Sequence, residues 1–290
     1  LKDTTWQLLS KNISYLYDEN LKVPLVQFVN NEQKLTITGE VKRDDRTPLR
    51  ILFDDVDLSA FTKGIFPEYK AYTGTINGQV LLYNLFEQPH FNAGMMVSSL
   101  KINKDTMGNM TFNANYRPEN GNINIESSLT NPKQEQLMNI VGFVNFRNET
   151  ENLNLLADFH KTNLALMEGF VNDYVSNLAG TFESRLLIKG SFGKPEISGF
   201  LDLNNAALTV NYLQTRYNLD HQISFNENRI PVNNLQLLDN NGQKATVNGV
   251  ITHDYFNNIR LDLRMNAQNF RALNTTKKDN EIFYGEAYAS

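Results

Sequence analysis

Histidine is the first residue type to examine for chemistry, because imidazole is both the commonest metal ligand and an acid–base group near neutral pH. The chain has four histidines, far apart in sequence and in no His-Glu-x-x-His pairing: His90, His160, His221 and His253. We expect turn or surface positions for all four and no metal site. The chain has no cysteine, which excludes a thiolate zinc site and a cysteine nucleophile.

Acidic and glycine-rich segments give no catalytic motif either. The densest carboxylate cluster is Asp54, Asp55 and Asp57, but the glycine and glutamate of a calcium-binding loop do not follow it at the required spacing. Residues 190–195 (GSFGKP) lead into a strand-like pattern, so they cannot present a helix N-terminus to a phosphate group. Nucleophile-elbow, Walker and dinucleotide-binding motifs are absent. The sequence predicts a protein that is not an enzyme and needs no cofactor.

Composition limits the partners. Of the 290 residues, 41% are hydrophobic, which is too many for a disordered tail, and 27 basic against 32 acidic residues give a net charge of -5. Binding to a phosphate backbone needs a positive excess, so we expect no nucleic-acid partner. No apolar stretch is long enough to span a membrane as a helix. The chain starts without a methionine or a signal pattern and stops in mid-pattern, so we interpret it as a fragment of a longer protein.

The elements that would position any site are mostly strands. Strict alternation of apolar and polar residues, which indicates strands with one face out of water, recurs from residues 35–41 (LTITGEV) to residues 259–267. Residues 110–116 and 123–125 flank a turn sequence at 118–121 (PENG) and should form an antiparallel hairpin. From this pattern we expect an all-β fold with roughly fifteen to eighteen strands.

One segment has helical spacing instead. Six apolar residues fall at i, i+3, i+4, i+7, i+8 and i+11, namely Met167, Phe170, Val171, Tyr174, Val175 and Leu178. This spacing predicts a crossover helix over residues 164–178 that lays all but the last of these side chains on the sheet. A movable cover over a ligand groove and a membrane contact are the alternatives. A second short helix could follow Leu58, where Pro67 interrupts the pattern.

The sequence also repeats itself at a spacing of about 106 residues. Placing Leu58 on Leu164 aligns Gly74 with Gly180 without a gap, and one deletion then carries Gly180 onto Gly285. We expect a single elongated fragment built from about three repeats, over residues 1–80, 81–186 and 187–290.

Glycines in the middle of alternating strands predict how the sheet bends. Gly39, Gly142 and Gly249 occupy similar places in the repeat, and a glycine inside a strand usually marks a bend or the close approach of another backbone. We therefore predict a long curved antiparallel or mixed sheet that forms an open apolar trough, with one or two short amphipathic helices. The alternative is a row of tandem β-sandwich domains, but Trp6 is the only tryptophan and no linker composition separates the copies.

Several motifs resemble the TamB family of AsmA-like envelope proteins, in the form found in Bacteroidota. They are residues 190–203 (GSFGKPEISGFLDL), 234–242 (NLQLLDNNG), 247–253 (VNGVITH), 269–274 (NFRALN) and 283–288 (FYGEAY). The resemblance implies a translocation and assembly module protein anchored in the inner membrane, which extends through the periplasm as a β-taco and engages an outer-membrane barrel of the BamA superfamily. It implies phospholipid transport between the two membranes, outer-membrane biogenesis and a role in protein secretion, with this chain as a middle section.

The resemblance gives the predicted trough a lipid-binding role. If one side of each strand lines the trough, the lining carries no charge. The candidate lipid-binding groove consists of Ile37, Val41, Ile76, Val80, Phe112, Ile125, Ile140, Val144, Leu155, Phe159, Leu201, Leu203, Leu208, Val210, Phe225, Leu237, Val247, Ile251, Leu261, Leu263 and Met265.

Three function classes therefore stay open. The first is a conduit whose apolar groove shields the acyl chains of phospholipids. The second is an assembly or chaperone platform for outer-membrane β-barrel proteins, which would use exposed sheet edges. The third is a structural or adhesive repeat protein, in which each repeat would close into a filled sandwich.

Overall fold

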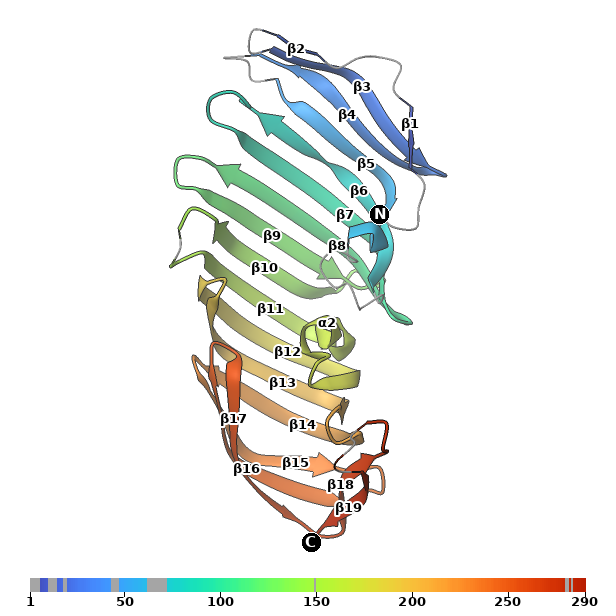
Figure 1. Cartoon of the computed structure of the whole chain (residues 1–290), viewed down its shortest axis with the longest axis vertical. Coiled ribbons are helices and arrows are strands. Elements are labelled where there is room, and N and C mark those ends of the chain that lie inside the picture. The colour runs from blue at the N-terminus through green and yellow to red at the C-terminus, as the bar shows by residue number, and fades with distance from the viewer. Residues whose placement is uncertain are drawn as a thin grey trace. The chain divides into compact units, whose positions relative to one another are not determined.

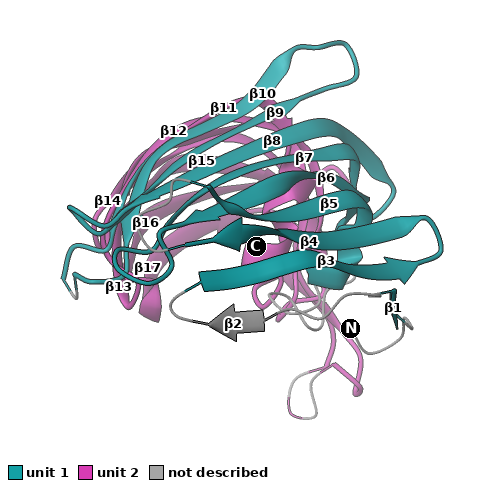
Figure 2. Cartoon of the chain, turned by 90° about the horizontal axis from the view of Figure 1, so that it is seen from above, with its two compact units in different colours: residues 1–155 teal, residues 156–290 magenta. Residues whose placement is uncertain are grey.

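Strands account for almost all of the structure (Figure 1). The computed structural model describes residues 6–9, 15–17, 20–42, 47–61, 72–148, 150–279, 282 and 284–290, and in them it has 19 strands and only short helical turns. The predicted all-β fold is confirmed. The chain divides into two compact units, residues 1–155 and 156–290 (Figure 2). This division does not coincide with the three predicted repeats, which remain a prediction.

Unit 1 is an antiparallel meander, in which each strand from β3 to β10 is paired with its neighbours along the chain. The predicted hairpin is present, with Arg117 opposite Asn122. β1 and β2 both pair with β3, at its opposite ends. The strands are β1 (Gln7–Leu8), β2 (Tyr15–Tyr17), β3 (Asn20–Asn30), β4 (Gln33–Val41), β5 (Leu49–Asp57), β6 (Tyr72–Tyr83), β7 (His90–Ile102), β8 (Asp105–Arg117), β9 (Asn122–Thr130) and β10 (Gln136–Asn145).

Unit 2 continues the meander pattern. The boundary between the units falls within β11 (Leu153–Asn163), and the strands from β12 to β17 pair in sequence order. β18 and β19 pair only with each other, in a separate two-stranded sheet. The strands are β12 (Val175–Ser191), β13 (Lys194–Val210), β14 (Thr215–Asn226), β15 (Arg229–Leu238), β16 (Lys244–Asp254), β17 (Asn257–Ala267), β18 (Phe270–Thr275) and β19 (Gly285–Ala289).

The sheet of unit 1 is a single curved layer rather than half of a sandwich. The strands of unit 1 bend along their length in the view of Figure 2, and among the described residues of that unit no second sheet packs against the meander. This arrangement agrees with the predicted open trough and disfavours tandem sandwich domains, in which two sheets would enclose each core.

The glycines predicted to bend the sheet have nearly the same backbone conformation. Their φ angles are 144° at Gly39, 146° at Gly142 and 143° at Gly249. A β-carbon at Gly142 would collide with the carbonyl oxygen of Asn154, and one at Gly249 with that of Asp262. Glycine is required at these places because only it tolerates both the positive φ and the close approach of the next strand.

The helix predicted over residues 164–178 is wrong in its length and in the face it buries. Leu164–Met167 form a 3-10 turn (η1), α2 (Glu168–Val171) adds one α-helical turn, and β12 already begins at Val175. Phe170 and Tyr174 are 68% and 59% exposed, so they do not lie on the sheet. So short a helix has no propagation to offset its nucleation, and the following apolar residues are taken up by the strand. Residues 59–61 are helical at the equivalent place in unit 1, and Pro67 lies outside the described residues.

Candidate functional site: an apolar sheet face

The strand register of unit 1 gathers its apolar side chains on one face. Residues that stand directly opposite each other in antiparallel strands project to the same side of the sheet. Four such rows cross the strands, and none contains Asp, Glu, Lys or Arg. The rows are Leu82–Phe91–Tyr116–Ile123–Val144, Ile51–Val80–Ala93–Ala114–Ile125, Phe53–Gly78–Met95–Phe112–Ser127–Ile140 and Val56–Ile76–Val97–Met110–Leu129–Met138.

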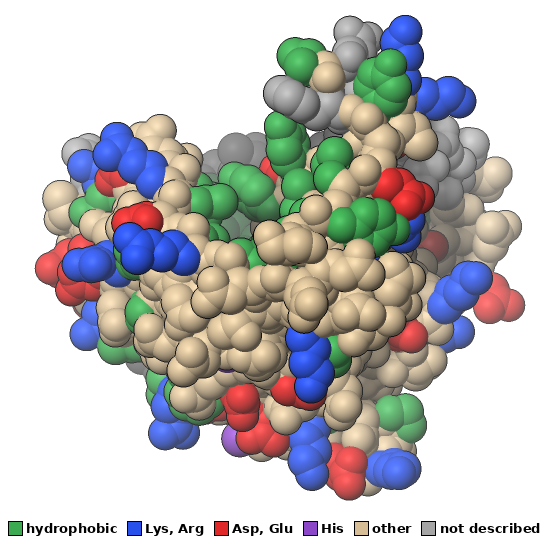
Figure 3. All heavy atoms as spheres, turned by 90° about the horizontal axis from the view of Figure 1, so that it is seen from below, with side chains coloured by type: hydrophobic (Ala, Val, Ile, Leu, Met, Phe, Trp, Pro, Cys, Tyr) green, Lys and Arg blue, Asp and Glu red, His purple; other side chains and the backbone are tan. Residues whose placement is uncertain are grey.

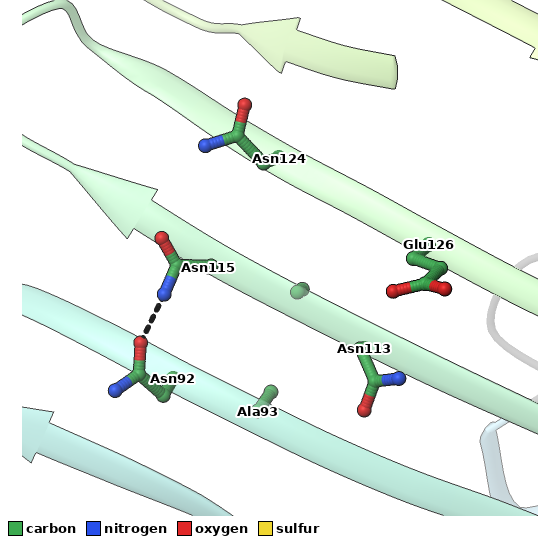
Figure 4. Close-up of a pocket in the computed structure, with 7 residues that line it drawn as sticks. Asn92, Ala93, Asn113, Asn115, Asn124 and Glu126 are labelled. Atoms are coloured by element: carbon green, nitrogen blue, oxygen red, sulfur yellow. Dashed lines mark hydrogen bonds between the residues drawn. The ribbon is translucent and has the colours of Figure 1, made fainter. Parts of the chain in front are cut away.

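The opposite face of unit 1 is largely polar. Asn92, Asn115 and Asn124 stand opposite one another on β7, β8 and β9, and the Asn115 amide donates a hydrogen bond to the Asn92 side-chain oxygen (Figure 4). Together with Asn113 and Glu126 they line a cavity of about 290 Å³. Among the described residues that line it, Glu126 is the one titratable side chain.

Unit 2 has an equivalent apolar face. The rows across β15, β16 and β17 are Leu237–Ala245–Ala267, Leu235–Val247–Met265, Val232–Gly249–Leu263 and Ile230–Ile251–Leu261. Across β12, β13 and β14 the opposed apolar pairs are Phe182–Leu203, Leu201–Ile223 and Leu208–Tyr217. Figure 3 shows hydrophobic side chains gathered in a hollow of the surface, with charged side chains around its outside.

Register places most of the predicted lining residues on these faces. Ile37 stands opposite Ile51 and so joins a row of unit 1, and the Phe159 ring lies 5.1 Å from the ring of Phe182 in unit 2. Their exposure differs widely, because Val41 is fully buried whereas Leu261 is 65% exposed. The structure thus groups the predicted residues by unit, and lipid binding by them remains a prediction.

Part of each apolar face is covered by the protein itself. In unit 1, Leu85 and Phe86 from the loop between β6 and β7 pack against a cluster that contains Val41. In unit 2, Phe270 of β18 is 1% exposed and stacks on Tyr217 with 5.2 Å between the ring centroids. Three of the predicted lining residues therefore belong to local cores instead of an open lining. They are Val41 in unit 1, and Val210 and Leu237, which pack around Phe270 in unit 2.

The cover in unit 2 is held by a buried carboxylate. Asp239 accepts hydrogen bonds from the backbone N–H groups of Asn241 (2.8 Å), Gln243 (2.9 Å) and, in β18, Arg271 (2.8 Å). Burial raises the pKa of Asp239. The three N–H donors together lower this pKa by more than burial raises it, so it lies below its ordinary value. The Tyr217 hydroxyl donates to the Arg271 carbonyl at 3.1 Å, and burial raises the pKa of Tyr217.

His253 is the one buried histidine of the described chain and lies within strand β16, so the turn or surface position expected for it is corrected. It lies beside the turn between β16 and β17, where Nδ1 accepts the Phe256 N–H at 3.0 Å and Nε2 is buried without a hydrogen-bond partner. Burial lowers the His253 pKa, partly opposed by the charge of Asp254. The imidazole stacks on the Phe256 ring with 4.3 Å between the ring centroids, so it packs against this turn.

The remaining candidates for chemistry have structural partners. Asp57 caps the turn at residues 59–61, because its carboxylate accepts the Ser59 N–H at 2.8 Å, and Asp55 accepts a hydrogen bond from the Asn77 amide at 3.0 Å. Across the described residues, no three His, Asp or Glu side chains are grouped as metal ligands. No helix in that part of the chain is long and apolar enough to cross a membrane.

Comparisons with known proteins add no relative. No family model matches the chain, and the curated proteins and solved structures give no significant match. The resemblance to the TamB family therefore rests on the motifs in the sequence alone.

The residues that hold the cover are only partly signalled in the sequence. Asp239 opens an Asp-Asn-Asn-Gly turn, and an aspartate there favours hydrogen bonds to the backbone two residues on. That signal predicts the bond to Asn241. It does not predict the bond to Arg271, which is 32 residues away and meets Asp239 only in the folded chain.

Proposed function

We propose that this chain is a non-enzymatic section of a periplasmic conduit whose apolar groove shields phospholipid acyl chains on their way between the inner and outer membranes. One observation supports this most strongly: in each unit the main sheet has an apolar face that contains no charged residue in its strand rows. Such a face would normally be buried in a core, and its partial exposure is the expected property of a surface that binds apolar ligands.

The energetics fit a passive path. Exposing an acyl chain of about fifteen methylenes to water costs about 12 kcal/mol, at about 0.8 kcal/mol for each methylene. A continuous apolar face removes most of this cost while the head group stays in water. Transfer from a bilayer to such a face is close to neutral, so the conduit needs no energy source of its own.

The resemblance to TamB supports the place and partners in this proposal. It assigns the chain to a protein that is anchored in the inner membrane and spans the periplasm, with a BamA-superfamily barrel as its partner at the outer membrane. Outer-membrane biogenesis and protein secretion then depend on the same protein.

Native mass spectrometry of the purified chain tests the proposal. We expect co-purified phospholipid that is released by organic extraction and that rebinds when phosphatidylethanolamine vesicles are added. A chain that is folded, lipid-free after purification and unable to take up lipid from vesicles would contradict the proposal.

A second candidate is the assembly platform for outer-membrane β-barrel proteins. The observation in its favour is the exposed edge strand β17, because exposed edges accept added strands. A synthetic strand peptide that protects β17 amides from hydrogen exchange, in a chain that binds no lipid, would favour this candidate.

A further inference from the structure

The outermost described strand of unit 2 is β17. β17 pairs with β16 along its length and with no other described strand of unit 2, and all but the last of its residues are exposed. Leu261, Leu263 and Met265 are among them, although they belong to the apolar rows of the sheet. An exposed edge with apolar side chains favours pairing with a further strand.

The two earlier copies of the repeat indicate which strand belongs there. In the first copy, Asp57 caps a helical turn after β5, and the chain returns as β6 beside β5. In the second copy, Asn163 caps η1 after β11 in the same way, because its side chain accepts the Ala165 N–H at 2.9 Å. The chain then returns as β12 beside β11, where Arg185 forms an ion pair with Asp158 at 2.6 Å.

The third copy departs from this pattern. Asn269 occupies the position of Asn163 but has a φ of 53° and caps no helical turn, and the chain continues as β18, which pairs with β19. Gly285, in the position of Gly180, keeps a positive φ of 123°. A β-carbon at Gly180 would collide with the next strand, whereas one at Gly285 would meet nothing within 4 Å. Gly285 thus has the backbone of a strand inside a sheet without the neighbour that requires it.

We propose that the outer edge of β17 is a strand-binding surface and that its occupant is the chain's own segment 285–289, which leaves β18 and places residues 287–289 beside residues 265–267, as β6 and β12 lie beside β5 and β11. Carrying the Phe53–Gly78 pair through the repeat places Met265 opposite Ala289. The residue types support this register, because a bulky apolar residue and a small one recur at the two positions: Phe53, Phe159 and Met265 against Gly78, Ser184 and Ala289.

The move of segment 285–289 from β18 to β17, called the exchange below, changes the apolar face of unit 2. Phe270 takes the position of Leu164, which is buried in the helical turn η1 beside β12, and so leaves its contacts with Tyr217 and Ala245. In the hairpin state, in which β18 pairs with β19, β18 covers part of this face. The exchange makes that part accessible. The hydrogen bond from the Arg271 N–H to Asp239 holds the hairpin state.

Engineered disulfides test the exchange cleanly, because the chain has no cysteine of its own. The reporter pair is Met265→Cys with Ala289→Cys, oxidised at low protein concentration under native conditions. The matched control is Leu261→Cys with Ala289→Cys, which is four residues out of register on the same strand. Opposed residues in paired strands meet disulfide geometry, so we expect the reporter to form at least about tenfold faster than the control.

A second measurement links the exchange to the hairpin. Adding Asp239→Asn to the reporter removes the charge that holds Arg271 and should raise the rate of disulfide formation severalfold, with circular dichroism confirming that the sheet stays folded. Reporter and control pairs that form at equal rates would overturn the proposal, as would a rate that Asp239→Asn leaves unchanged. A disulfide-linked dimer as the main product would assign the edge to a second copy instead.

Discussion

A charge on the apolar face of unit 1 should separate an open groove from a filled core. Ile140 belongs to a row of that face, opposite Ser127, and is half-buried. Val141, the next residue, projects to the polar face opposite Glu126 and is 36% exposed. Ile140→Arg and Val141→Arg therefore introduce the same charge one residue apart on opposite sides of one strand.

The two architectures predict different losses of stability. In a filled core the guanidinium of Ile140→Arg would be buried without a partner, at a cost of several kcal/mol, enough to unfold a domain whose total stability is about 5–15 kcal/mol. On an open face the side chain reaches water, and the loss is only the burial of the isoleucine, about 1–2 kcal/mol. Val141→Arg should cost less still, because Glu126 stands opposite.

Lipid binding should fall more in Ile140→Arg than in Val141→Arg. If the guanidinium introduced by Ile140→Arg keeps water around about five methylenes of a bound chain, binding loses about 4 kcal/mol, or about a thousandfold in affinity. The assay pairs urea denaturation of each variant with recovery of a photocrosslinked phospholipid. Unfolding of Ile140→Arg would refute the open groove, and full lipid recovery from a folded variant would refute the conduit. An equal loss of lipid in Val141→Arg would show that the effect is not specific to the apolar face.

Three further predictions concern the packing of the sheet and its cover. Gly142→Ala should lower the free energy of unfolding by about 3–5 kcal/mol, because backbone strain adds to a collision with the next strand. Gly285→Ala introduces the backbone strain alone and should cost less. Equal losses for the two variants in urea titrations would contradict this prediction. Asp239→Asn should cost about 2–4 kcal/mol and speed hydrogen exchange in β18. Because the Asp239 pKa is lowered, this stability is present above its ordinary value of 3.8 and is lost as the pH falls through the lowered pKa, a dependence that the variant should lack. The lowered pKa of His253 predicts that stability falls as the pH drops below 6.5, and His253→Gln should flatten this slope in urea titrations across that pH range.

The local features of the fold were determined by the sequence alone. Alternation in residues 110–116 and 123–125 with a turn between them predicts β8, β9 and their hairpin, because a period of two residues and a tight turn are properties of neighbouring residues. The same holds for Gly142 and Gly249, whose positions inside alternating strands predict a close approach of the adjacent backbone.

The tertiary structure decided how far local preferences extend. The helical spacing of residues 164–178 predicts one long helix, but the chain spends only the first half of that segment in helical turns. The last four residues of the segment, from Val175, belong to β12, where pairing with a neighbouring strand supplies hydrogen bonds that a lone helical turn does not. Competition between two local patterns is settled by which of them finds a partner.

The candidate site likewise has features that the sequence predicts and features that only the folded chain defines. The apolar character of each strand face is present in the sequence, but the rows that make a continuous face depend on register, which pairs Phe112 with Met95 and Ser127 from other strands. The cover over unit 2 depends on Asp239 and Phe270, which contact their partners only through folding. Residue periodicity is a one-dimensional property and reports which side of a strand avoids water. Which apolar side chains remain open and which are covered follows from contacts between segments far apart in sequence, and only the folded chain defines those.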